Sequence, residues 1–233
     1  MGLLSFLFGG VKPKGSVSES VHPEYHEPPE KKLKKAELYL KEAVKCKKTD
    51  IDEAVKLLKK AYELDKKYDL RLDTNKYTRL PKYLQNVGRS GDALDEMGRL
   101  TAYGTPLSKR THSAFSYHMS ECHSAFAVIK KKQKVSGDEV LAEKCLADIY
   151  DLNGFLWKSS ENLAWTRNLG IAESSKEYKE EKKWSRGHAD EKVDRIEKAY
   201  PQLNGNVKIG DLNFPMKNIK EQDYYDAFMS PNG

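Results

Sequence analysis

The stretch Tyr77–Leu100, YTRLPKYLQNVGRSGDALDEMGRL, decides the fold of this chain. Its apolar residues recur at helical spacing in two runs. In chain order the two runs contain Tyr77, Leu80, Leu84 and Val87, and then Ala93, Met97 and Leu100. Gly88 and the polar turn from Ser90 to Asp92 separate them. Two amphipathic helices joined by a short turn predict an antiparallel helical hairpin.

This hairpin resembles one unit of the tetratricopeptide (TPR) repeat family. Tyr77 stands at the first aromatic position of the repeat, and Gly88 stands in the turn between the helices. Ala93, Met97 and Leu100 match the contact positions of the second helix. The preceding helix repeats these contact positions with Ala54, Leu58 and Ala61. The resemblance covers residues 34–104 and implies hairpins that stack into a solenoid with a concave binding face.

Other start signals extend the helical pattern along the chain. Asp50 with Glu53 and Ser136 with Glu139 have the form of capping boxes, and Thr105 before Pro106 predicts a helix start. The helix from Thr105 is expected to reach about residue 132 and to bury one stripe. That stripe comprises Phe115, Met119, Cys122, Phe126 and Ile129. The helix over 30–47 is expected to bury Ala36, Leu40, Ala43 and Val44.

The sequence therefore predicts an all-α protein of stacked antiparallel helical hairpins, a TPR-like solenoid, with a long C-terminal helical hairpin and an irregular tail. Its segments are a flexible N-terminal segment and linker at 1–29, TPR-like hairpins at 30–104, a long helical hairpin extension at 105–200 and an irregular tail at 201–233. Ser174 with Glu177 predicts a further helix start. The polar residues 176–192, which Gly187 interrupts, are expected to be exposed or mobile.

Composition and charge favour a soluble helical protein. The chain has 233 residues, a third of them charged, and a formal charge of +6. Its apolar start, MGLLSFLFGG, is similar to that of many soluble bacterial proteins and is too short to span a membrane, so stable membrane insertion is not expected. The three cysteines are an odd number and lie far apart, which predicts reduced thiols and a cytoplasmic location.

Motifs of catalysis and cofactor binding are absent from the sequence. It contains no Walker loop, dinucleotide fingerprint, HExxH pair or nucleophile elbow. We therefore expect a protein that is not an enzyme and that needs no cofactor. The expected function is that of an adaptor or scaffold, which holds a partner protein or peptide, or a second copy of itself, on a helical-repeat groove.

The resemblance also implies where that partner binds. In the TPR family the ligand lies on the concave face, which the first helices of the hairpins form. Here that face carries Asn75, Thr78, Lys82 and Gln85, whose spacings of three and four place them on one helical stripe. Their polar side chains suit an extended peptide or an acidic helix.

Two alternatives remain open from the sequence. The lysine-rich helix over 30–47 and the run Lys130–Lys134 suit nucleic acid or another phosphate-bearing surface. His118 and Cys122 lie one turn apart on the same helix face, which is a spacing that supplies two ligands to zinc, so a metal-binding or enzymatic protein is the other alternative.

Overall fold

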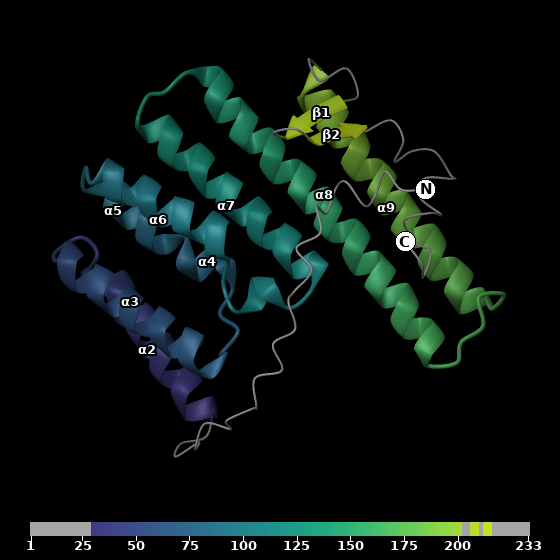
Figure 1. Ribbon diagram of the computed structural model, residues 1–233, viewed down its shortest axis with the longest axis horizontal. Helices are drawn as coiled ribbons and strands as arrows, with labels where there is room; N and C mark the ends of the chain where they lie inside the picture. The colour runs from purple at the N-terminus through teal and green to yellow at the C-terminus, as the bar shows by residue number, and fades with distance from the viewer. Residues whose placement is uncertain (1–28, 202–205, 210–211, 216–233) are drawn as a thin grey trace. The chain divides into compact units, whose positions relative to one another are not determined.

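The computed structural model describes residues 29–201, 206–209 and 212–215, and nearly all of them are helical (Figure 1). The predicted all-α class is confirmed at this level. The predictions for residues 1–28 and 216–233 lie outside the described residues. In chain order the elements are α2 (Pro29–Cys46), α3 (Ile51–Tyr68), α4 (Thr74–Tyr77), α5 (Arg79–Asn86), α6 (Ser90–Tyr103), the 3₁₀ turn η1 (Leu107–Lys109), α7 (His112–Lys132), α8 (Gly137–Asn168), α9 (Lys176–Ala199), β1 (Asn206–Ile209) and β2 (Leu212–Pro215).

The larger of two compact units, Glu27–Lys158, is built from helical pairs. In Figure 1, α2 lies beside α3, and α5 lies beside α6. The α3 helix also contacts α5, so the two pairs are neighbours. One continuous core joins them. It includes Ala36, Leu40, Ala43, Ala54, Leu58, Ala61, Leu80, Leu84, Ala93, Met97 and Leu100, together with Cys122, Ala125 and Ile129 of α7.

Small side chains alternate with large ones in this core, which lets the helices approach closely. Ala54 and Ala61 flank Leu58 on α3, and Ala93 precedes Met97 on α6; all are fully buried. Burying a leucine or methionine side chain contributes roughly 1.5–3 kcal/mol to folding. The contact positions that the sequence analysis assigned to the second helix of each hairpin are therefore core positions.

Local start signals in this unit are confirmed at two helices. The Asp50 carboxylate accepts a hydrogen bond from the Glu53 backbone N–H at 2.9 Å, which caps α3. The Ser136 hydroxyl accepts one from the Glu139 N–H at 3.2 Å, just before α8. Each bond satisfies a backbone donor that has no partner inside its helix.

The predicted start of the helix after Tyr103 is wrong. Thr105 does not cap α7, because it forms a closed turn with Ser108, in which each residue's backbone N–H donates to the other's hydroxyl. The α7 helix begins instead at His112, where Thr111 accepts a hydrogen bond from the Ala114 N–H at 3.1 Å. Both threonines could cap a helix, but the hydroxyl of Thr105 is used in the turn with Ser108, so Thr111 caps α7.

Three apolar residues that were assigned to buried stripes are exposed instead: Val44, Val87 and Phe115. Val87 follows the end of α5 and so no longer continues its helical face. Val44 lies at the edge of the buried row of α2, which comprises Ala36, Leu40 and Ala43, so its side chain faces partly toward solvent. On α7, Phe115 lies in the first turn on nearly the same face as the buried Met119 and Cys122, yet it is exposed at that end of the helix.

The second unit, whose described part begins at Ser159, contains the last turns of α8, all of α9 and a β-hairpin. Its buried side chains include Leu163, Tyr178, Ala189, Val193 and Ile196. The expected interruption at Gly187 is wrong, since α9 runs unbroken from Lys176 to Ala199, and its cap is Ser175 in place of Ser174. Within the segment expected to be an irregular tail, β1 pairs antiparallel with β2.

Gly154 of α8 makes a close approach to α7 possible. A β-carbon at Gly154 would lie 3.0 Å from two ring carbons of Tyr117, whereas one at Gly98 of α6 would meet nothing within 4 Å. We expect Gly98→Ala to raise the unfolding free energy by about 0.5–1 kcal/mol, because alanine is the better helix former. Gly154→Ala should lose that gain or lower the unfolding free energy by about 1 kcal/mol, because the ring must move.

Urea unfolding followed by circular dichroism measures both changes. The matched background is Tyr117→Leu, in which Gly154→Ala should recover the stabilisation that Gly98→Ala gives. Equal stabilisation by the two alanines in the unmodified chain would show that Tyr117 does not constrain Gly154.

Candidate binding pocket between the first two hairpins

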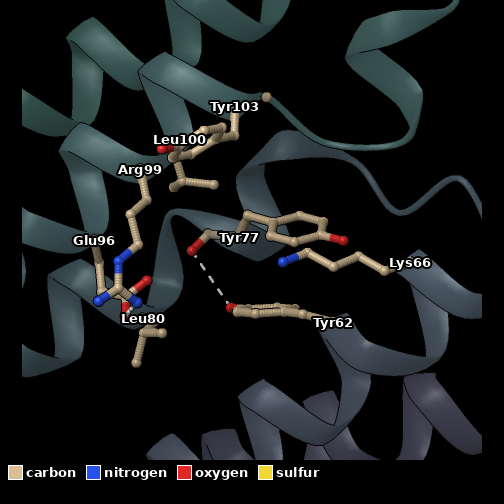
Figure 2. Close-up of a pocket in the computed structure, with 9 residues that line it drawn as sticks. Tyr62, Lys66, Tyr77, Leu80, Glu96, Arg99, Leu100 and Tyr103 are labelled. Carbon is tan, nitrogen blue, oxygen red and sulfur yellow. Dashed lines mark hydrogen bonds and ion pairs between the residues drawn. The ribbon is translucent and has the colours of Figure 1, made fainter.

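A pocket of about 190 Å³ lies where α3, α4, α5 and α6 meet (Figure 2). Its lining residues come from both helical pairs and are Tyr62, Lys66, Tyr77, Leu80, Glu96, Arg99, Leu100, Tyr103 and Gly104. Lys66, Arg99 and Tyr103 are exposed, which places them at the mouth, whereas Tyr62, Tyr77, Leu80 and Leu100 are buried. The pocket therefore has an apolar, aromatic floor and a charged rim.

A break in the first helix of the second pair creates part of this floor. Pro81 has no backbone N–H, so the carbonyl of Tyr77 loses the partner that a continuous helix would supply. The Tyr62 hydroxyl of α3 donates instead to the carbonyl of Lys76 at 2.8 Å and to that of Tyr77 at 3.4 Å. Figure 2 shows this contact between Tyr62 and Tyr77. The two rings stack with their centroids 4.3 Å apart.

The Tyr77 hydroxyl is also used within the protein. It donates to a carboxylate oxygen of Asp65 at 2.6 Å, and the other oxygen of Asp65 accepts from the Leu72 N–H at 3.4 Å. Burial, followed by the bond to Asp65, raises the pKa of Tyr77 above its usual value, so this hydroxyl stays a donor. Burial raises the pKa of Tyr62 in the same way. Both hydroxyls thus already donate hydrogen bonds within the protein, so the two tyrosines line the pocket with the surfaces of their rings.

The rim of the pocket carries more positive than negative side chains. Arg99 and Glu96 of α6 form an ion pair at 3.1 Å, in which the arginine is 65% exposed and the glutamate 20%. Lys66 of α3 is exposed, and no ion pair of Lys66 with another described residue is observed. The rim therefore carries a net positive charge, and the guanidinium of Arg99 keeps N–H donors beyond the one that Glu96 accepts.

Gly104 shapes the mouth next to Tyr103. It follows the last residue of α6 and has a φ of +65°, a backbone conformation that residues other than glycine rarely adopt. A β-carbon there would also lie 2.5 Å from the Ser108 hydroxyl oxygen. The turn leaves Tyr103 72% exposed beside the opening. An exposed aromatic ring at the edge of a pocket is a feature typical of interaction surfaces.

The four residues that the sequence analysis assigned to a partner lie elsewhere. Asn75 is exposed, but Thr78 is fully buried, and its hydroxyl accepts from the Lys82 ammonium group at 3.3 Å. Burial lowers the pKa of Lys82, against the opposing charge of Glu121 on α7. Gln85 accepts a hydrogen bond at 3.0 Å from Gln133, which follows α7. Much of this polar stripe therefore faces α7 of the same chain.

His118 and Cys122 lie together on α7 in a closed environment. The Leu100 carbonyl lies 2.8 Å from Nε2 of His118 and can only accept, so Nε2 carries the proton. The hydroxyl of Thr74 then donates to Nδ1 at 2.9 Å. Burial lowers the pKa of His118 and raises that of Cys122 to about 12. Both ring nitrogens thus have partners within the protein, and the residue ties α4, α6 and α7 together.

The pKa of His118 predicts how stability depends on pH. Unfolded His118 takes up a proton near its usual pKa of 6.5, whereas burial lowers the pKa in the folded state. This contribution to the unfolding free energy is complete above pH 6.5 and is lost as the pH falls from 6.5 through the lower, folded pKa. The advantage of the unmodified chain over His118→Gln should therefore shrink below pH 6.5. Urea unfolding of both proteins in buffers from about pH 7.5 to about pH 5 tests this, and a constant difference contradicts it.

Several potential metal ligands and lysines in the described ranges have contacts within the protein. No group of three His, Cys, Asp or Glu side chains in these ranges is arranged to hold a metal ion. Lys130 and His123 share the carboxylate of Glu143, each at 2.7 Å. Burial raises the pKa of Glu143, but the hydrogen bonds from His123 and Lys130 outweigh it and lower the pKa overall. On α2, α3 and the residues between, lysine ammonium groups lie over tyrosine rings, in the pairs Lys32–Tyr68, Lys67–Tyr68, Lys60–Tyr39 and Lys47–Tyr83.

The described residues define a mainly helical protein with this pocket between its first two helical pairs. Comparison of the chain with protein-family models, with curated proteins and with solved structures gives no match. In the ranges that the structure describes, no helix is long and apolar enough to cross a membrane.

Proposed function

We propose that this protein is a non-enzymatic adaptor that binds a partner protein through the surface around the pocket between α3 and α6. The observation that carries the proposal is the pocket itself, which joins two successive helical pairs and has a buried aromatic floor beside the exposed Tyr103. Residues that dominate protein interfaces typically insert an aromatic or charged side chain into such a pocket.

The size of the pocket supports a protein partner over a cofactor. Sites for drug-sized ligands have volumes of about 300–1,000 Å³. At about 190 Å³ this pocket is smaller and suits a single side chain. The surface also replaces the stripe of Asn75, Thr78, Lys82 and Gln85 as the principal contact in this proposal, because α4 and α5, which carry most of that stripe, contact α7. All three cysteines, Cys46, Cys122 and Cys145, are free thiols, which supports the cytoplasm as the place of action.

Capture of partners by the full chain from a cell lysate of its host tests the proposal. The test variant is Tyr103→Asp, which places a charge at the exposed rim without touching the core. The matched control is Leu38→Asp, which changes an exposed apolar residue of α2 outside the pocket. A partner that binds the unmodified chain and the control should be lost, or bound about tenfold more weakly, with Tyr103→Asp when the purified pair is measured.

Equal binding by all three proteins would show that the pocket surface is not the interface. If the captured protein is a second copy of this chain, size-exclusion chromatography with light scattering will detect a dimer that Tyr103→Asp dissociates.

A further inference from the structure

The lining of the pocket restricts what the partner inserts. The Tyr62 and Tyr77 hydroxyls are committed to backbone carbonyls and to Asp65, and the remaining floor is Leu80 and Leu100. A polar side chain placed there would lose its hydrogen bonds to water without replacement. An aromatic side chain instead gains contact with the stacked tyrosine rings, in addition to the burial of its own apolar surface.

Charge at the mouth restricts the neighbouring residue. Lys66 approaches the pocket from α3, and Arg99 lies on α6 with Glu96 beside it (Figure 2). Because Glu96 neutralises one cation, the rim carries a single net positive charge. One carboxylate next to the inserted side chain would complement that charge, with Lys66 and the free N–H groups of Arg99 as its donors.

From these two constraints, and resting on the function proposed above, we infer that the pocket receives one aromatic side chain of a partner segment, with an aspartate or glutamate beside it held by Lys66 and Arg99. The exposed ring of Tyr103 then covers the outer edge of the inserted side chain. A nucleic-acid strand fits less well, because it carries a negative charge at every nucleotide, and the Glu96 carboxylate lies at the same rim.

Fluorescence anisotropy with the full chain and short labelled peptides tests this inference. The first probe has one phenylalanine flanked on both sides by aspartates. The second replaces the phenylalanine with serine, and the third replaces the aspartates with lysines. We expect the first probe to bind and the other two to bind at least about tenfold more weakly, as the loss of an anchor residue typically causes.

Protein variants connect this binding to the pocket. Lys66→Glu should weaken the first probe about tenfold. The matched control is Lys67→Glu, which makes the same charge change on the adjacent residue of α3, outside the pocket lining, and should change the affinity less than about twofold. Circular dichroism must show that both variants are folded to the same extent.

Several outcomes overturn the inference. They are equal binding of the phenylalanine and serine probes, equal effects of Lys66→Glu and Lys67→Glu, and displacement of the first probe by a single-stranded oligothymidine that itself binds the pocket. If no probe binds while Tyr103→Asp still abolishes capture of a purified partner, the stated chemistry is wrong and the proposed function stands. If Tyr103→Asp leaves capture unchanged, the proposed function itself fails.

Discussion

Replacing Asp65 with alanine is expected to lower the unfolding free energy by about 3 kcal/mol, because each buried donor left without an acceptor costs about 1–3 kcal/mol. The side chain is fully buried and accepts from two groups, the Tyr77 hydroxyl and the Leu72 N–H. Its removal leaves both donors unpaired beneath the pocket floor. Urea unfolding of the full chain followed by circular dichroism measures the change.

The control for this prediction lies on the same helix. Glu63 is exposed on α3, and Glu63→Ala should change the unfolding free energy by no more than about 0.5 kcal/mol. Tyr77→Phe removes one of the two donors, so the double variant Asp65→Ala with Tyr77→Phe should be less destabilised than the sum of the single variants. Additive effects, or equal effects of the two alanines, would show that Asp65 does not hold this network together.

His118→Ala is expected to lower the unfolding free energy by about 3 kcal/mol, through a cavity and through the loss of two hydrogen bonds. His118 is 1% exposed, and its ring connects the Thr74 hydroxyl to the Leu100 carbonyl. Alanine leaves that carbonyl without a donor from α7. The same urea measurement applies, and the single variant Thr74→Val should cost about 1 kcal/mol.

The histidine prediction also separates a structural role from metal binding. If His118 acts as a structural residue, Thr74→Val and His118→Ala should be strongly non-additive, and the purified full chain should contain no stoichiometric metal. A metal that is present in the unmodified chain and absent from Cys122→Ser would contradict the structural role and favour the metal alternative.

Signals carried within one turn of helix were predictable from the sequence. The caps at Asp50 and Ser136 depend on a side chain and a backbone N–H three residues later, so the sequence contains both partners. The same rule misplaced the start of α7, because Thr105 and Thr111 are both suitable caps and the choice depends on Ser108. Gly187 was misread as a break, since one glycine costs a helix only about 1 kcal/mol.

The pocket was not predictable in this way, because its halves come from different helical pairs. Tyr77 fits a core position in the sequence, whereas Tyr62 was not among the contact positions expected on its helix, and the stacking of the two rings appears only when α3 meets α4. Likewise, nothing near Lys82 or Gln85 indicates that α7 packs against them. One signal was available: Pro81 inside a helical pattern leaves a carbonyl that requires a donor from elsewhere in the fold.

The Tyr77 carbonyl accepts a hydrogen bond from a side chain where a continuous helix would supply a backbone N–H, and this gives a criterion for recognising relatives of the protein by descent. The Tyr62 hydroxyl and Pro81 act on the same carbonyl, because Pro81 leaves the Tyr77 carbonyl without its helical donor. The phenol donates chiefly to the Lys76 carbonyl at 2.8 Å and also reaches the Tyr77 carbonyl at 3.4 Å. Lineages that keep the proline should keep the tyrosine, and lineages that lose the proline should still favour a hydroxyl at position 62, because the Lys76 carbonyl accepts the shorter bond from it. Joint inheritance of this pair would mark homologues whose remaining sequence has diverged.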